Sequence, residues 1–246
     1  MAAHLKRFAL RRAHLWLVLA MGIASARSAI AGDPAAGCAQ GTDPAQTITD
    51  CSTLIESGRL TPPDAAAAYD NRGNAHLAKG DNGAAIQDFE AAMKLAPGFA
   101  KAQLDRGIAY GRQGNYDHAI ADYDAVLKAN PSDVGALRAR GWAYNYKHQF
   151  DHAIDDFNAE IEIKDDDAIG YNGRGWAYLL IGELKQALDD FNHALAIAPD
   201  GADALYGRGL AKDRLGDAPG AAADYGAARA LAPDIESLLR HKQLIM

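Results

Sequence analysis

The dipeptide Arg-Gly recurs along this chain at a constant interval of 34 residues. A period of about 20–50 residues is the signature of repeat proteins, in which each unit packs on its neighbours to build one continuous core. The interval therefore predicts a solenoid, so the 246 residues need not form two separate domains. The five copies begin at Arg72, Arg106, Arg140, Arg174 and Arg208.

Other positions recur in the same register. An alanine lies thirteen residues after each arginine, and an aromatic residue follows four positions later. Glycine and alanine let two helices approach closely, and the aromatic ring fills the space beside that contact. Eight residues further on, a proline ends the second helix in four copies, and Asp165 stands there in the third. The recurring residues are Ala85, Ala119, Ala153, Ala187 and Ala221, then Phe89, Tyr123, Phe157, Phe191 and Tyr225.

A second glycine separates the two helices of a repeat at Gly80, Gly114, Gly182 and Gly216, and His148 takes its place in the third copy. The combined pattern resembles the tetratricopeptide repeat family from about Ala66 to the C-terminus. The resemblance implies an all-α, right-handed superhelical solenoid of helix-turn-helix repeats. We expect five repeats over residues 66–233, at 66–99, 100–133, 134–167, 168–201 and about 202–235. A half-repeat cap over residues 32–65 and a closing helix over 234–246 complete the expected fold.

The recurring arginines share the packing side of the first helix with apolar residues, and an aspartate precedes each aromatic residue of the second helix. Unpaired charges on such half-buried positions would be costly, so we predict a ladder of Arg-Asp pairs between the helices. A column of arginines that binds anions is the alternative. Lys101, by contrast, is expected to be a surface residue without a structural role.

Residues 1–31 have the features of a secretory signal peptide. Basic residues are followed by an apolar run from Leu15 to Ala24 and by small residues, with cleavage expected after Ala31. The run is too short for a stable membrane span, so we expect no membrane insertion after cleavage. The chain is therefore expected in the periplasm, and the resemblance is to small exported proteins of Gram-negative bacteria.

Cys38 and Cys51 are the two cysteines of the sequence. An even number in an exported protein predicts one disulfide, which would join the leading coil to the half-repeat cap. A lipid anchor on Cys38 is the alternative, because residues 35–38 faintly resemble a lipoprotein cleavage site.

In related repeats the inner groove is lined by the first helix of each unit, two residues before the arginine, two after it and one turn further on. This resemblance implies a peptide groove with two tryptophans at equivalent positions. The alternative is that both tryptophans pack between neighbouring helices. The implied groove residues are Leu104, Ile108, Arg138, Trp142, Tyr146, Asn172, Trp176, Leu180, Tyr206 and Leu210.

Composition and motifs argue against several other functions. The net charge is −7, and it becomes −12 without residues 1–31, which hold five basic residues and no acidic ones. Nucleic acid is therefore an unexpected partner. We find no motif of an enzyme or of a cofactor site, and we expect none.

The sequence favours a non-enzymatic scaffold that binds a protein or peptide segment. An envelope adaptor anchored by lipid, serving cell-wall or export machinery, is one alternative. Binding of a metal by His118, His148 and His152, or of another small ligand, is the other.

Overall fold

The computed structural model describes residues 34–241 and 244–245, so the predicted signal peptide at 1–31 lies outside the described residues. Every regular element of the described part is a helix. The helices are α1 Pro34–Gln40, α2 Pro44–Glu56, α3 Pro62–Ala78, α4 Asn82–Leu95, α5 Ala100–Arg112, α6 Tyr116–Ala129, α7 Val134–Tyr146, α8 Phe150–Ile163, α9 Ala168–Ile181, α10 Leu184–Ile197, α11 Ala202–Arg214, α12 Ala218–Leu231 and α13 Ile235–His241.

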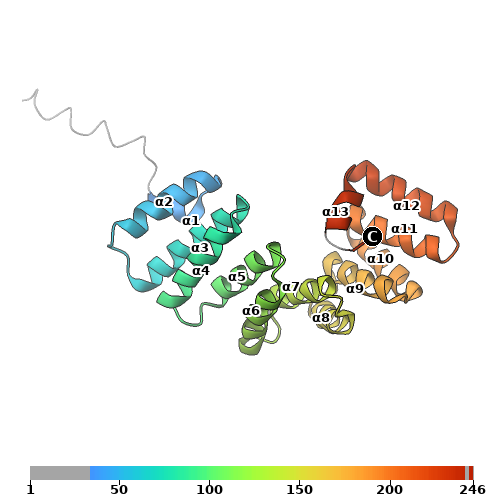
Figure 1. Cartoon of the computed structure of the whole chain (residues 1–246), viewed down its shortest axis with the longest axis horizontal. Helices are drawn as coiled ribbons and strands as arrows, with labels where there is room; N and C mark the ends of the chain where they lie inside the picture. Colours follow the sequence, from blue (N-terminus) through green and yellow to red (C-terminus); the bar gives the residue numbers. More distant parts are fainter. Residues whose placement is uncertain (1–33, 242–243, 246) are drawn as a thin grey trace, which may run out of the picture.

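Successive helices pack as antiparallel pairs. From α3 to α12 each odd-numbered helix packs on the next helix of its own repeat, and that helix packs on the following repeat. Contacts between α7 and α9, and between α9 and α11, place the first helices of successive repeats side by side. The result is a curved solenoid, which confirms the predicted fold class (Figure 1).

Aspartates and turn residues set the ends of many helices. The side chain of Asp133 accepts a hydrogen bond from the Ala136 N–H at 2.9 Å, and Asp167 accepts one from the Ile169 N–H at 3.1 Å. Asp167 thus caps the start of α9, in the turn where Asp165 replaces the proline of the other repeats. Between the helices of a repeat, the predicted glycines have φ between 77° and 89°, and His148 has φ of 57°. His148 therefore adopts a backbone conformation that favours glycine.

The repeated glycines lie against the repeated aromatic rings. A Cβ atom added to Gly141 would come 2.9 Å from Cζ of Phe157, and one added to Gly107 would come 2.5 Å from Cε1 of Tyr123. Phe157 is also approached by Gly173 of the next repeat. The ring of Phe157 is therefore held between two close backbones, and each of the other rings lies against the glycine of its own repeat, as the spacing of small and aromatic residues predicts.

The predicted Arg-Asp ladder is confirmed. Each recurring arginine donates from Nε and Nη2 to both carboxylate oxygens of the aspartate sixteen residues later, at distances of 2.6–2.9 Å. The third nitrogen, Nη1, reaches the preceding repeat: that of Arg140 donates to Asp124 at 2.6 Å, and that of Arg174 to Asn158 at 2.6 Å. Each arginine therefore ties three helices together, and this pairing argues against an open anion-binding column.

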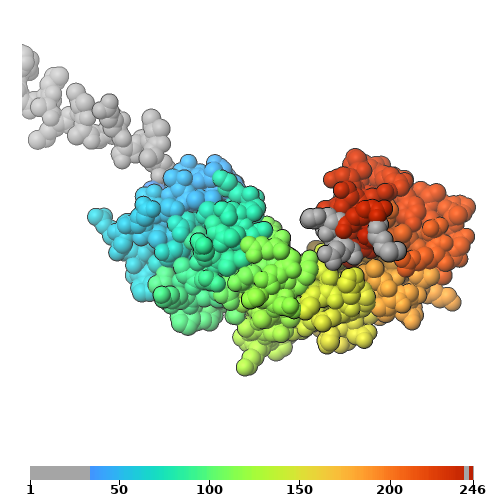
Figure 2. Space-filling model, viewed as in Figure 1, coloured from blue at the N-terminus to red at the C-terminus, as the bar shows by residue number. Residues whose placement is uncertain are grey.

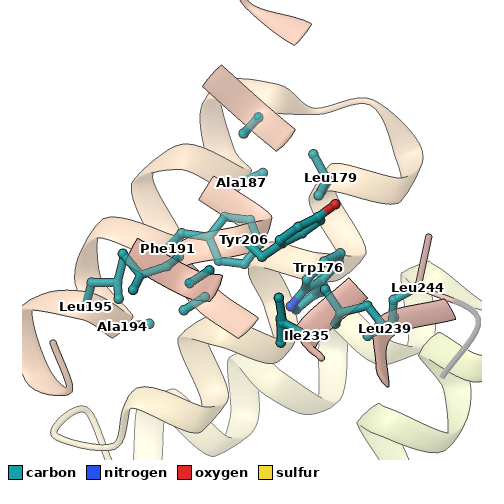
Figure 3. Close-up of a cluster of buried hydrophobic side chains, with 14 residues drawn as sticks. Trp176, Leu179, Ala187, Phe191, Ala194, Leu195, Tyr206, Ile235, Leu239 and Leu244 are labelled. Atoms are coloured by element: carbon teal, nitrogen blue, oxygen red, sulfur yellow. The ribbon is translucent and has the colours of Figure 1, made fainter. Parts of the chain in front are cut away.

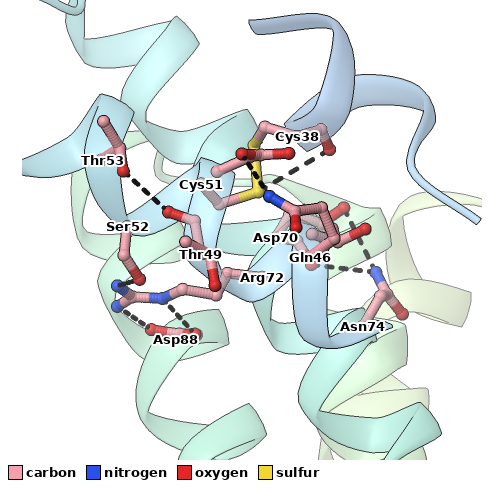
Figure 4. The surroundings of a disulfide bond; sticks show 12 residues. Cys38, Gln46, Thr49, Cys51, Ser52, Thr53, Asp70, Arg72, Asn74 and Asp88 are labelled. Carbon is pink, nitrogen blue, oxygen red and sulfur yellow. Dashed lines mark hydrogen bonds and ion pairs between the residues drawn. A yellow bond between two sulfur atoms is a disulfide. The ribbon is translucent and has the colours of Figure 1, made fainter. Parts of the chain in front are cut away.

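The disulfide predicted from the sequence joins Cys38 and Cys51, whose Cα atoms are 4.7 Å apart. Both residues are buried, and they pack with Ala68 of α3. Figure 4 shows the bond beside the first rung of the ladder, where Arg72 binds Asp88 and Ser52. One detail differs from expectation: Cys38 lies on a short helix, α1, and not in a coil.

The last helix packs mainly on α11, the first helix of the fifth repeat. Ile235 and Leu239 of α13 are completely buried, as is Leu244 beyond it. No helix within the described part of the chain combines the length and the apolar character that crossing a membrane requires.

Candidate functional site

The first helices of the repeats surround two adjoining hollows on the inner side of the curve. One, of about 600 Å³, lies between α5 and α7 and is lined by Ile108, Arg112 and Tyr116. The other, of about 380 Å³, reaches α9 and α11 and is lined by Ile169 and Asn172. Figure 2 shows the inner side open between the two arms of the solenoid, with the yellow-green helices at its floor.

Trp142 and Tyr146 form the wall shared by both hollows. Their rings are stacked, with centroids 5.9 Å apart, and Tyr116 lies against Tyr146 at 5.3 Å. Phe157 supports Trp142 from behind through an edge contact at 5.7 Å. Rigid aromatic side chains that are half-buried before binding are the residues that most often dominate an interface.

The polar groups around these rings are held in place. Burial, with Tyr116 and Asp203 nearby, raises the pKa of the Tyr146 phenol to about 12, so its hydroxyl group stays protonated and can donate. Asn172 donates from Nδ2 to Asp203 at 2.9 Å, while its Oδ1 accepts no hydrogen bond among the described residues. This oxygen is itself buried from solvent, so it is an unpaired acceptor of the interior.

Arg138, a predicted groove residue, forms ion pairs with two carboxylates. It donates from Nε to Glu160 at 2.7 Å and from Nη2 to Asp167 at 2.5 Å. Glu160 is completely buried, and burial raises the pKa of its carboxyl group although Arg138 acts to lower it. Arg138 therefore links α7 to α8 and to the start of α9 through Nε and Nη2.

Trp176 is not exposed in the groove. Its side chain has no solvent-accessible area, and it lies in one cluster with Tyr206, Ile235, Leu239 and Leu244. Figure 3 shows these residues of α13 and its extension beside the indole ring. The expectation that both tryptophans line an open groove is therefore wrong for Trp176, because the C-terminal segment covers it.

Some of the other predicted groove residues line the open hollows, and others are packed between repeats or lie beside the C-terminal segment. Ile108 lines the larger hollow, whereas Leu104 packs between repeats against two buried clusters. Leu180, Tyr206 and Leu210 lie beside the C-terminal segment, around a hollow of about 690 Å³. The resemblance thus places the side chains on the inner face, but the structure leaves only part of that face open.

Sequence reasoning missed three features of this face. Tyr116 belongs to a second helix, which the resemblance does not assign to the groove. Glu160 occupies the position of Ala92, Val126, Ala194 and Ala228 in the other repeats, and comparing the repeats would have revealed it. Lys101 also differs from expectation, because it binds the buried carboxylate of Asp70 at 2.5 Å.

The three histidines considered for a metal have other contacts. His118 is hydrogen-bonded to Asn115, His152 stacks on Tyr144, and His148 makes an edge contact with Phe150. Within residues 34–241 and 244–245 no group of three or more His, Cys, Asp or Glu side chains is placed to hold a metal ion.

Comparison with known sequences agrees with the repeat pattern. Three family profiles, each described as a tetratricopeptide repeat, match residues 66–99, 104–168 and 168–200. Together they cover more than half of the chain. No curated protein sequence matches it.

Solved structures share the fold at low sequence identity. A MamA fragment (residues 41 to the end) from Desulfovibrio magneticus RS-1 superposes with a TM-score of 0.62 at 22% identity, covering 69% of this chain and 96% of that one. YrrB, described as a TPR protein with an unusual peptide-binding site, gives 0.57 at 21% identity, covering 78% and 97%. A tetratricopeptide repeat protein from Parabacteroides merdae ATCC 43184 gives 0.69 at 18%, covering 85% and 86%.

Proposed function

Because the chain belongs to the tetratricopeptide repeat family, we propose that it is a non-enzymatic scaffold that binds a protein or peptide segment on its inner face. The observation that carries this proposal is the stacked pair of Trp142 and Tyr146, which lines both open hollows. Aromatic side chains provide a large contact area at little cost in conformational entropy.

The expected ligand is an extended segment with apolar side chains. The two hollows adjoin across the Trp142-Tyr146 wall, so side chains on both sides of one peptide can enter them. YrrB, which shares the fold, is described as having a peptide-binding site, and this likeness supports the same class of ligand here.

We place the protein in the periplasm. The support is the basic, apolar and small residues of segment 1–31, together with the Cys38-Cys51 bond, since disulfides persist in oxidising compartments. The bond also leaves no thiol on Cys38 for a lipid, which favours a soluble exported form over the lipid-anchored alternative. Intact mass and N-terminal sequencing of the mature protein test this: a chain starting at Gly32 is expected, whereas Met1 or an acylated Cys38 contradicts it.

Peptide binding is tested by selecting peptides from a displayed random library on the full chain. The selected peptides are then measured on Trp142→Ala and Tyr146→Ala, and each variant should weaken binding by about 2 kcal/mol. Tyr110→Ala is the matched control, since Tyr110 lies against His118 and lines neither hollow. Equal affinity for all three variants would place the contact surface elsewhere.

A further inference from the structure

The C-terminal segment, defined as α13 with Leu244 and Ile245, lies on the inner face of the solenoid. Ile235, Leu239 and Leu244 are buried in the cluster that contains Trp176. In Figure 2 the dark red atoms of α13 border the hollow between the two arms. The segment therefore covers the C-terminal end of the inner face, and the Trp142-Tyr146 wall lies next to this covered part, on the third repeat.

The segment shows which chemistry this end of the face accepts. The buried residues Ile235, Leu239 and Leu244 are separated by four and five positions, whereas Leu238 and Arg240 between them are exposed. Ile235 and Leu239, one turn apart on α13, form a short apolar ridge that lies in a groove, and Leu244 adds a buried contact after the helix ends. The groove beneath it is formed by Trp176, by Tyr206 and by neighbouring leucines of α9 and α11.

The fit between segment and groove is incomplete. The indole N–H of Trp176 is buried and has no acceptor among the described residues, and its nitrogen lies on the side of Ile235 and Leu239 (Figure 3). A hollow of about 690 Å³ remains between the segment and the leucines of α9 and α11. The ion pair that joins α13 to α12, Arg229 with Glu236, is largely exposed and holds the segment weakly. An occupant with an oxygen acceptor near the indole would satisfy a group that the segment leaves unpaired.

We propose that the C-terminal segment is a displaceable internal ligand, and that the surface around Trp176 is a second binding site for a short amphipathic helix of a partner protein. The partner helix carries two apolar residues at the spacing of Ile235 and Leu239, an apolar residue beyond its end in the place of Leu244, and a hydroxyl or carbonyl oxygen facing the indole. This inference rests on the proposed function, because it extends the binding face from the open hollows to the covered end.

The test uses the full chain and a fluorescein-labelled synthetic peptide with the sequence of residues 234–246. In the unmodified protein the attached segment competes with the peptide at a high effective concentration. Leu239→Glu places a charge in a completely buried position and should release the segment, so the peptide should bind this variant about tenfold or more tightly than the unmodified protein. Leu238→Glu makes the same change at an exposed position of the same helix, and it should leave peptide binding unchanged.

Equal peptide affinity for the Leu238 and Leu239 variants would overturn the proposal. So would loss of the cooperative helical unfolding transition in Leu239→Glu, which would make the segment part of the core. Hydrogen exchange of the unmodified protein gives a result that does not depend on any variant. Amides of α13 should exchange through local opening, about tenfold or more faster than those of α11. Equal protection of both helices contradicts a displaceable segment.

Two altered peptides test the acceptor, both measured on Leu239→Glu. Ile235→Thr puts a hydroxyl oxygen near the indole and should bind as tightly as the natural sequence or more so. Ile235→Ala removes apolar contact without adding an acceptor and should bind about fivefold or more weakly. Equal losses for the two peptides would overturn the role of the indole. The library peptides of the proposed function report on Trp142 whichever way this test ends, so the two failures can be told apart.

Discussion

Arg140 donates hydrogen bonds to both carboxylate oxygens of Asp156, from Nε at 2.9 Å and from Nη2 at 2.6 Å. Asp156 is buried, and burial raises the pKa of its carboxyl group although the hydrogen bonds and charge of Arg140 act to lower it. The aspartate therefore depends on the arginine to remain charged in the packed interface. The same pair recurs in all five repeats, so the ladder is a structural element of the solenoid.

Replacing Arg140 with leucine leaves Asp156 without its partner inside the interface. We expect Arg140→Leu to destabilise the protein by about 2–4 kcal/mol, measured by urea unfolding. Lys185→Ala, a change at an exposed position of α10, is the control and should be nearly neutral. Small and equal effects of the two changes would contradict a structural role of the ladder.

Gly107 has no space for a side chain, because a Cβ atom there would lie 2.5 Å from the ring of Tyr123. Gly107→Ala should therefore destabilise the protein by about 1–3 kcal/mol through displacement of the ring. Gly226 lies in the middle of α12 with nothing within 4 Å of its added Cβ atom. Gly226→Ala should instead stabilise by about 0.5–1 kcal/mol through helix propensity. Melting temperatures that shift in the same direction for both variants would refute the packing argument.

His148 adopts a positive φ of 57° at a position where the other repeats have glycine. Since a Cβ atom is disfavoured in this backbone region, His148→Gly should raise the unfolding free energy by about 0.5–1 kcal/mol. The reverse change, Gly114→Ala, meets no neighbouring atom and should lower it by a similar amount. A destabilised His148→Gly would mean that the contact of His148 with Phe150 outweighs the backbone strain.

Glu160 predicts a dependence of stability on pH. Burial raises its pKa above the ordinary 4.5 in the folded protein, so between the two values the folded state binds more protons than the unfolded state. Stability contributed by Glu160 therefore falls as pH rises through this window. Glu160→Gln removes the titration and should gain stability relative to the unmodified protein as the pH rises above 4.5, by about 1.4 kcal/mol for each unit of raised pKa. Unfolding free energies measured at several pH values check this.

The exposed Glu162→Gln measures the effect of removing one surface charge on the same helix. The difference between the two variants isolates the buried carboxylate. A Glu160→Gln curve that falls relative to the unmodified protein with rising pH would show that Arg138 outweighs burial.

Local packing could be predicted because the same contact is made five times. Gly107 is followed 34 residues later by Gly141, and Tyr123 by Phe157, so each repeat supports the interpretation of the others. The Arg-Asp ladder follows in the same way from charge, spacing and the cost of burial. The position of Arg138 on the inner face could also be predicted. Its ion pair could not, because the partner Glu160 departs from the repeat pattern in a single repeat.

The state of the inner face could not be predicted, because it depends on contacts that do not repeat. Trp142 and Trp176 occupy equivalent positions 34 residues apart, and nothing within their own repeats distinguishes them. The difference comes from Leu239 and Leu244, which return from the end of the chain to cover one of them. Periodicity describes a unit and its neighbours, whereas this contact joins the fourth repeat to the closing segment.

The two tryptophans should consequently behave differently in solution. In the mature chain expected to start at Gly32, Trp142→Phe leaves Trp176 as the one tryptophan, and Trp176→Phe leaves Trp142. Acrylamide should quench the Trp176→Phe variant more strongly, because Trp142 lines the open hollows while Trp176 has no accessible area. Trp176→Phe should also destabilise the protein by about 1–3 kcal/mol more than Trp142→Phe, since it leaves a cavity under Leu239. Equal quenching together with equal stability would mean that the closing segment does not cover Trp176 in solution, and the inner face would then be open along its whole length.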